Sequence, residues 1–282
     1  MFGRFAIYAN VVGRTGALRS GALLNVEHMR FRLSGTGVIL ILMRSIETLL
    51  HFRSDLSPFL VHLTRSKDGA SARENLESIV KNELLFPGIV SDARFAVPPR
   101  EADDYDLLAA SAFSETPLGE IHSLFEIASR QVNLEPYGLV FLKHKLSARS
   151  VSPVIYVNNE QGDKDAVIRA LATLRRSHPK AAAQLLPLVA VFGKKLSPVG
   201  GTPSVGRVDF TWEREWRYAY ANGAFEFVQA DVFVELCPHE EIRYFERLYR
   251  PVSFVDPRRN VRWYAAKLVK ARHRTGLKYS VV

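Results

Sequence analysis

The chain has 282 residues, 47% of them hydrophobic and 24% charged, and its 38 Lys and Arg against 29 Asp and Glu give a formal net charge of +9. This balance excludes a disordered or fibrous protein and predicts a soluble globular one with a buried core. The single cysteine, Cys237, excludes an intrachain disulfide and an all-cysteine metal site. No apolar run approaches the ~20 residues of a membrane helix, so we expect no membrane contact.

Residues 1–50 are predicted to be an N-terminal appendage. They contain six arginines, no lysine and no proline, and they show no clean helical period. The run Gly37–Met43 is typical of a buried strand or a short core helix. Met43 opens a stretch that would itself make a sensible protein start, which leaves open whether residues 1–42 belong to the native protein. The chain shows no secretory signal layout, and we expect a cytoplasmic protein.

The next two elements are well marked in the sequence. Pro58–Arg65 is apolar and β-compatible, with a proline at its start, and predicts a buried strand. Ser71–Leu85 has apolar residues at helical spacing, and Ser71 with Glu74 resembles a capping box. A strand followed by a helix is therefore expected here.

Strands and helices continue to alternate along the rest of the chain. The expected elements are a strand ending at Phe113, a helix from Pro117 to Arg130, strands over 137–143 and 152–159, a helix over 163–177, and strands over 209–220 and 226–236 that form a hairpin around 221–224. There are no regular βαβ units. The pattern predicts an α+β fold with a mixed or antiparallel sheet and flanking helices over residues 51–240.

A cluster of charged residues and tryptophans lies within the expected strand over 209–220. If the strand is regular, Glu213, Glu215 and Arg217 share one face, and Trp212 and Trp216 share the other. Adjacent carboxylates repel each other, and a chain tolerates this where it needs them for a metal, a sugar hydroxyl or a cationic transition state. The alternative is a solvated strand face with Glu–Arg pairs.

Four further residues are candidates for a binding site. His62 and Thr64 fall on one face of the expected strand, and both can hydrogen-bond a ribose or an amide. Glu115 lies at a strand end before a proline break, where functional residues often occur. Tyr156 is an ordinary strand aromatic unless its surroundings give it a role. A glycine-rich phosphate loop and the HExxH and GxSxG motifs are absent from the sequence, and a zinc site is unsupported.

Several of these segments occur in an order that resembles the AbiGi-like abortive-infection (phage-resistance) family. They are PFLVHLTR, FSETPL, PYGLVFLK, PVIYV and WEREWR, and FSETPL and WEREWR are the more specific of them. The pattern H-x-T…NL…I is also similar to the first strand of DarT-like ADP-ribosyltransferases. The resemblance covers roughly residues 57–240. It implies a split β-sheet like that of ADP-ribosyltransferases, with NAD bound as a substrate.

The resemblance also implies roles for individual residues. His62 and Thr64 match the first strand that holds a ribose of NAD. Glu215 matches the glutamate that binds the nicotinamide ribose and stabilises the oxocarbenium-like transition state, where a preorganised carboxylate opposes the positive charge that develops. Glu213 would then orient or deprotonate the acceptor.

The remaining implied contacts complete the cofactor-binding set. Glu115 and Tyr156 would line the nicotinamide pocket, and Arg217 lies in line with the two glutamates. The chain lacks the arginine motif that DarT-like proteins carry near this segment, and no metal is expected. The resemblance also implies a phage-defence protein with a toxin or antitoxin partner.

The C-terminal segment over 241–282 is predicted to be a basic tract outside the α+β domain. It carries only Glu241, Glu246 and Asp256 against eleven cations: Arg243, Arg247, Arg250, Arg258, Arg259, Arg262, Lys267, Lys270, Arg272, Arg274 and Lys278. A nucleic acid is the natural partner for such a tract, and Tyr244, Tyr249, Trp263 and Tyr264 are possible stacking groups. A solvated basic helix is the alternative.

Three functions therefore stay open. The first is a NAD-dependent ADP-ribosyltransferase acting on nucleic acid or protein. The second is a non-catalytic antitoxin-like or nucleic-acid-binding module on the same fold. The third is a metal-dependent nuclease that uses Glu115, Glu213 and Glu215.

Overall fold

The structure is a computed structural model of the chain, and it describes residues 29–34, 37–42, 56–90, 106–126, 134–158, 160, 163–194, 207–208, 211–249 and 251–277. The chain divides into two units, Met1–Ile46 and Glu47–Val282. In the first unit, β1 (Met29–Ser34) and β2 (Gly37–Leu42) form an antiparallel hairpin with Ser34 opposite Gly37. Within the predicted run Gly37–Met43, the described residues Gly37–Leu42 form a strand.

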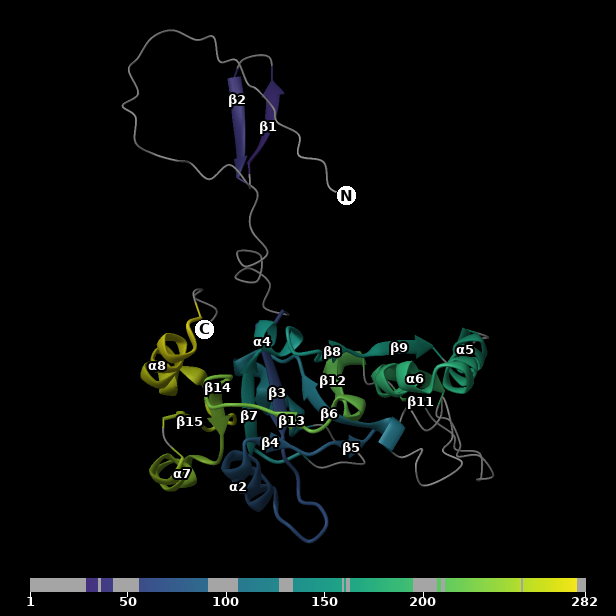
Figure 1. Cartoon of the computed structure of the whole chain (residues 1–282). Coiled ribbons are helices and arrows are strands. Elements are labelled where there is room, and N and C mark those ends of the chain that lie inside the picture. Colours follow the sequence, from purple (N-terminus) through teal and green to yellow (C-terminus); the bar gives the residue numbers. More distant parts are fainter. Residues whose placement is uncertain are drawn as a thin grey trace. The chain divides into compact units, whose positions relative to one another are not determined.

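The second unit is built on a mixed eight-stranded sheet (Figure 1). Seven strands follow the order β15-β14-β7-β3-β6-β12-β8, and β5 pairs with β6. All neighbours are antiparallel except β14 and β15. The strands are β3 (Phe59–Leu63), β5 (Gly88–Ile89), β6 (Ala109–Ser114), β7 (Gly138–Leu142), β8 (Ser152–Pro153), β12 (Glu215–Ala219), β14 (Val232–Leu236) and β15 (Phe254–Val255).

A smaller sheet and a two-stranded ribbon complete the strands. The smaller sheet pairs β9 (Ile155–Asn158) in parallel with β10 (Val189–Lys194), which is antiparallel to β11 (Arg207–Val208). The ribbon pairs β4 (Leu84–Leu85) with β13 (Phe225–Glu226). Helices α5 (Asp163–Ser177) and α6 (Pro179–Leu185) connect β9 to β10 and lie beside β9 (Figure 1). The expected α+β class with a mixed sheet is confirmed.

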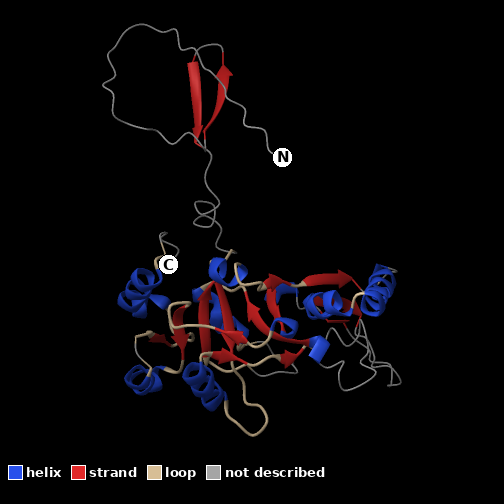
Figure 2. Cartoon of the chain, in the orientation of Figure 1, coloured by secondary structure: helices blue, strands red, loops and turns tan. Residues whose placement is uncertain are grey.

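The remaining helices surround the main sheet (Figure 2). The α-helices are α2 (Ala72–Asn82), α4 (Lys143–Ser147), α7 (Ile242–Leu248) and α8 (Ala265–Thr275), and α8 packs beside β14. Short 3₁₀ helices are η3 (Asp106–Leu108), η4 (Leu118–Leu124), η5 (Leu186–Leu188), η6 (Thr211–Glu213), η7 (Tyr220–Asn222), η8 (His239–Glu241) and η9 (Val261–Tyr264).

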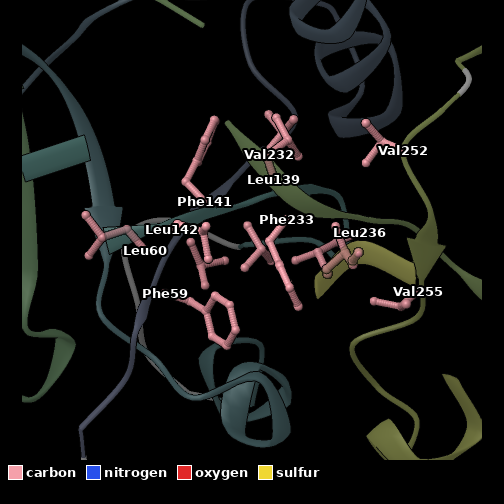
Figure 3. Packing of buried hydrophobic residues seen from close by; sticks show 14 of the residues in the cluster. Phe59, Leu60, Leu139, Phe141, Leu142, Val232, Phe233, Leu236, Val252 and Val255 are labelled. Atoms are coloured by element: carbon pink, nitrogen blue, oxygen red, sulfur yellow. The ribbon is translucent and has the colours of Figure 1, made fainter. Parts of the chain in front are cut away.

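One large hydrophobic core is built around the central strands of the main sheet. Figure 3 shows Phe59 of β3 beside Phe233 of β14, with their ring centroids 4.6 Å apart. Both side chains are almost fully buried, as are Phe141 and Leu236 nearby. Burial of a side chain of this size contributes about 1.5–3 kcal/mol to stability. These central strands therefore carry much of the stability of the unit.

The C-terminal segment belongs to this same core. Phe245 of α7, Phe254 of β15, Tyr264 of η9 and Leu268 of α8 are all buried in it. The segment over 241–282, which the sequence set apart, therefore supplies apolar side chains to the domain in its described part. The sequence did not predict this role, because the buried apolar residues of the segment are scattered among its basic residues.

Two helices match their predictions closely. Ser71 caps α2, where its Oγ accepts a hydrogen bond from the Glu74 N–H at 3.2 Å and the Glu74 carboxylate accepts one from the Ser71 N–H at 2.8 Å. The capping box is thus confirmed, and α5 spans the predicted 163–177. The strand within Pro58–Arg65 and the strand within 137–143 are also confirmed.

The predicted strand over 209–220 is confirmed only over Glu215–Ala219, and its predicted hairpin is wrong. β12 begins only at Glu215, because Thr211–Glu213 form η6 and Arg214 has a left-handed φ of 45°. β12 then lies between β6 and β8, whereas β14 lies between β7 and β15. The two segments are therefore not neighbours, because after η7 the chain first pairs Phe225 with β4.

Two other predicted elements differ in the structure. The helix after Pro117 is the 3₁₀ helix η4, and the last part of the expected range, 127–130, lies outside the described residues. The expected strand over 152–159 divides at Val154 into β8 and β9, which belong to different sheets. The Val154 N–H donates to the Glu215 carbonyl at 2.9 Å, so the chain leaves the main sheet after this last bond.

Candidate functional site

The Glu215 and Arg217 side chains form a buried ion pair on one face of β12. Arg217 Nε lies 2.8 Å from Glu215 Oε1, and Arg217 Nη2 lies 2.7 Å from Oε2. Arg217 Nη1 donates to the Pro187 carbonyl at 2.8 Å, and the Arg217 side chain is 2% exposed. The two-point geometry satisfies both charges. Glu215 therefore neutralises a buried arginine in addition to any catalytic role.

Glu213 does not stand beside Glu215 on a strand face. It ends η6, and the left-handed Arg214 separates it from β12, so the alternation of a strand does not reach it. The prediction that Glu213 and Glu215 share one face of β12 is therefore wrong. Glu213 still lies close enough to Tyr156 for its charge to act on that phenol.

Glu115 forms the centre of a second polar cluster where β6 ends. Its Oε1 lies 3.0 Å from Lys143 Nζ and 3.0 Å from Arg214 Nη2, and both contacts are ion pairs rather than hydrogen bonds. Its Oε2 accepts a hydrogen bond from Trp216 Nε1 at 3.0 Å. The Glu115 N–H also donates to the Arg214 carbonyl. A buried carboxylate thus connects the end of β6 with the start of α4 and with β12.

Tyr156 of β9 joins this polar cluster to the smaller sheet. Its hydroxyl oxygen accepts a hydrogen bond from the Glu215 N–H at 3.1 Å. Burial raises the pKa of the Tyr156 phenol, and the charge of the Glu215 carboxylate raises it further. Tyr156 is therefore neutral near pH 7 and can act there as a hydrogen-bond donor.

His62 and Thr64 lie elsewhere. His62 Nδ1 donates to the Ala112 carbonyl at 2.8 Å, and its ring centroid lies 5.8 Å from that of Phe113. Burial lowers the pKa of the His62 imidazole, which keeps it neutral at pH 7. Thr64 is buried, and its hydroxyl donates to the Ala72 carbonyl at 2.8 Å. That hydrogen bond ties the end of β3 to the start of α2.

Five of the seven predicted site residues lie near the start of β12, in two groups. Glu215 pairs with Arg217 and bonds to Tyr156, and the charge of Glu213 also acts on the Tyr156 phenol. Glu115 instead contacts Trp216, Arg214 and Lys143. His62 lies on the face of Phe113, whose partner in β12 is Trp216, whereas Glu215 and Arg217 point to the opposite face. The predicted meeting of His62 and Thr64 with Glu215 does not occur in the sheet.

A second candidate surface lies on η9 and α8. Trp263 is 73% exposed, and the Arg259 guanidinium carbon lies 5.5 Å from the centre of its ring. Arg262 and Lys270 are also exposed. No Asp or Glu occurs anywhere from Pro257 to Leu277. We call Arg259, Arg262, Trp263 and Lys270 the basic face.

The other described cations of the segment 257–277 are used mainly within the fold. Arg258 pairs with Asp256 at 2.8 Å, and Lys267 pairs with Glu246 at 2.8 Å. Arg274 donates to the Val232 and Phe233 carbonyls at 2.7 and 2.8 Å. Within the part of the chain that is described, neither Arg262 nor Lys270 has an acidic partner at ion-pair distance. Their charge is therefore directed to solvent.

The four aromatic residues predicted as stacking groups differ in their exposure. Tyr264 is buried, and its hydroxyl lies 3.2 Å from His239 Nδ1. Tyr249 packs against the main core, and the Tyr244 ring is contacted by the Arg73 guanidinium at 4.6 Å. Trp263 remains as the most exposed large hydrophobic side chain of the described residues. The residues next to Trp263 in the sequence do not indicate that Trp263 is exposed and Tyr264 is buried.

The basic face borders a small hollow rather than a ligand-sized pocket. Arg259, Val261, Tyr264 and Leu268 line it together with Leu118 and Ile121 of η4. It has room for roughly one water molecule. A ligand of the basic face therefore has to bind on the surface.

Comparisons of the chain with protein-family models, with curated proteins and with solved structures return no match. Among the residues that the structure describes, no three His, Cys, Asp or Glu side chains gather in a way that could hold a metal ion. None of the helices in the described ranges has the length and apolar character that crossing a membrane requires.

Proposed function

We propose that this chain binds nucleic acid through the basic face. The observation that carries the proposal is the exposed Trp263 beneath Arg259, in a stretch of 21 residues from Pro257 to Leu277 without an acidic side chain. Lys and Arg bind phosphates and release counterions, which supplies most of the affinity of such complexes. Exposed aromatic rings among these cations add contacts to bases.

A solvated basic helix explains less of what is observed. Such a helix needs no exposed tryptophan, and tryptophan side chains are on average highly buried. The Arg259 guanidinium also packs over the Trp263 ring, whereas the side chains of a solvated helix need not contact each other. The combination favours a binding surface over a merely solvated one.

The test is binding of a labelled oligonucleotide by fluorescence anisotropy at low and moderate salt. The triple variant Arg259→Gln/Arg262→Gln/Lys270→Gln should bind at least tenfold more weakly than the wild type and should have a shallower salt dependence, because three phosphate contacts are lost. The matched control is Arg169→Gln/Arg176→Gln/Lys180→Gln, which removes three exposed cations of α5 and α6. Equal loss in both variants would show non-specific attraction only and would refute the basic face as the site.

A second candidate function is NAD-dependent ADP-ribosyl transfer, as the resemblance implies. The observation that favours it is the group of Glu213, Glu215, Arg217 and Tyr156 at the start of β12. In this proposal the cluster binds the nicotinamide ribose, and a carboxylate there opposes the positive charge of the transition state. The basic face would then hold a nucleic-acid acceptor.

The direct test of this second function is calorimetric titration of the protein with NAD. Saturable binding that is weakened by Glu213→Gln and Tyr156→Phe supports it. Glu215→Gln is a less clean variant, because Glu215 also neutralises Arg217, so its melting temperature has to be measured alongside. The absence of binding at millimolar NAD rules the transferase out. A setting in phage defence, with a toxin or antitoxin partner, rests on the resemblance and stays a prediction.

A further inference from the structure

We infer that the basic face selects single-stranded over double-stranded nucleic acid by stacking an unpaired base on the indole of Trp263. This inference rests on the proposed function and names the form of nucleic acid that the face binds. It concerns Trp263 rather than the cations, because cations attract the phosphates of both forms.

One face of the Trp263 ring is open to a base. Arg259 is the only ring contact described for Trp263, at 5.5 Å from the ring centre, and the side chain remains 73% exposed. Arg259 therefore covers at most one of the two ring faces. A base stacked on the other face would complete a sandwich of guanidinium, indole and base, in which the cation favours the electron-rich ring.

The indole is held on a rigid support. The Asn260 side chain caps η9 by accepting a hydrogen bond from the Arg262 N–H at 3.0 Å. The next residue, Tyr264, is buried in the core and contacts His239. The backbone on both sides of Trp263 is thus held in place. Stacking a base on the indole therefore costs little conformational entropy in the protein.

The phosphates of a strand can reach cations on either side of this platform. Arg262 adjoins Trp263 in η9, and Lys270 lies further along α8. Ala266 lies one turn before Lys270 at helical spacing, and it is exposed and small. This gives a strip in which an aromatic ring is flanked by cations, as single-strand-binding surfaces require.

A duplex cannot use this strip fully. Its bases are already stacked on each other, and a side chain can meet only their edges unless the stack is opened. Stacking on an aromatic side chain strengthens single-strand binding by roughly five- to a hundredfold per base. The wild type should therefore bind a single strand about tenfold or more tightly than the duplex of the same sequence.

The experiment measures anisotropy with one labelled oligonucleotide, alone and annealed to its complement, at a fixed salt concentration. Trp263→Ala should weaken single-strand binding about tenfold and leave duplex binding within about twofold of the wild type. Trp263→Phe keeps an aromatic face and should retain most of the single-strand affinity. Heparin, a polyanion without bases, should bind the wild type and Trp263→Ala with equal affinity.

The outcomes separate the inference from the proposal on which it rests. If the wild type binds both forms equally, or if Trp263→Ala weakens both equally, base stacking is refuted while nucleic-acid binding stands. If neither form binds, the proposed function itself is refuted. Because Trp263 is largely exposed, the variants should keep the melting temperature of the wild type, and this is measured first.

Discussion

At the scale of single residues, Glu235 is the group whose charge is least compatible with its position. It lies in β14 with 1% of its surface exposed, and its Oε2 has no hydrogen-bond partner in the described part of the chain. Burial raises the pKa of the Glu235 carboxyl to about 8, and the nearby Arg274 charge offsets only part of this. The carboxyl is therefore mostly protonated at neutral pH.

This raised pKa predicts a dependence of stability on pH. Between its ordinary pKa of about 4.5 and the folded value of about 8, Glu235 holds a proton in the folded state but not in the unfolded state. The free energy of unfolding should therefore fall as the pH rises through this range, by up to roughly 5 kcal/mol. Urea unfolding of the wild type and Glu235→Gln at about pH 5 and about pH 8 measures it.

Glu235→Gln should flatten that decline, since glutamine stays neutral, and it should be the more stable protein at the higher pH. His62 titrates as well, with a lowered pKa that makes stability rise with pH, so only the difference between wild type and variant reports on Glu235. The same pH slope in both proteins would show that the carboxyl is ionised in the folded state.

The Glu215–Arg217 pair gives a second prediction at this scale. Glu215→Ala leaves the Arg217 guanidinium buried without a counter-charge, which should cost roughly 3–5 kcal/mol of stability. The control is Glu120→Ala, which removes an exposed carboxylate of η4 and should cost less than about 1 kcal/mol. Chemical denaturation measures both. Equal effects would mean that the ion pair does not stabilise the fold.

At the scale of elements, α2 is fixed by local contacts. Ser71→Ala removes the hydroxyl that caps the Glu74 N–H and should lower stability by about 1 kcal/mol, whereas Ser71→Thr keeps the hydroxyl and should change it by a few tenths. Thermal unfolding of both variants decides this. A Thr variant as unstable as the Ala variant would mean that the cap contributes little.

Elements set by local interactions were predicted from the sequence better than those set by contacts between distant segments. The start of α2 and both ends of α5 were predictable because caps and helical periods are set by residues a few positions apart, whereas α2 ends at Asn82, three residues before the predicted Leu85. The hairpin around 221–224 was not, because the neighbours of β12 and β14 are chosen by distant strands. The start of β12 depends on the left-handed Arg214, for which an arginine gives no local signal.

The candidate sites show the same division. The sequence placed Glu215 and Arg217 on one strand face, which the structure confirms, although Glu213 was placed on the wrong element. Which C-terminal aromatic is exposed could not be read from the chain. Trp263 and Tyr264 are adjacent, yet one lies in solvent and the other in the core, because the turn η9 directs them apart.

At the scale of the whole molecule, the C-terminal segment both stabilises the second unit and carries the basic face. Deleting residues 242–282 should prevent folding, because Ile242, Phe245, Phe254 and Leu268 leave the core. Deleting residues 1–46 should leave the second unit folded, since the chain divides there. Cooperative melting followed by circular dichroism tests both. A cooperative transition in the C-terminal deletion would contradict the shared core.

The measurement that tests the central claim most directly is photo-crosslinking of a bound oligonucleotide, followed by mass spectrometry of the peptides. Our account predicts that the crosslinked peptides come from residues 258–273, with Trp263 among the crosslinked residues, and that Trp263→Ala reduces their yield. Crosslinks confined to other parts of the chain, such as α5, or no crosslinks at saturating oligonucleotide, would contradict it.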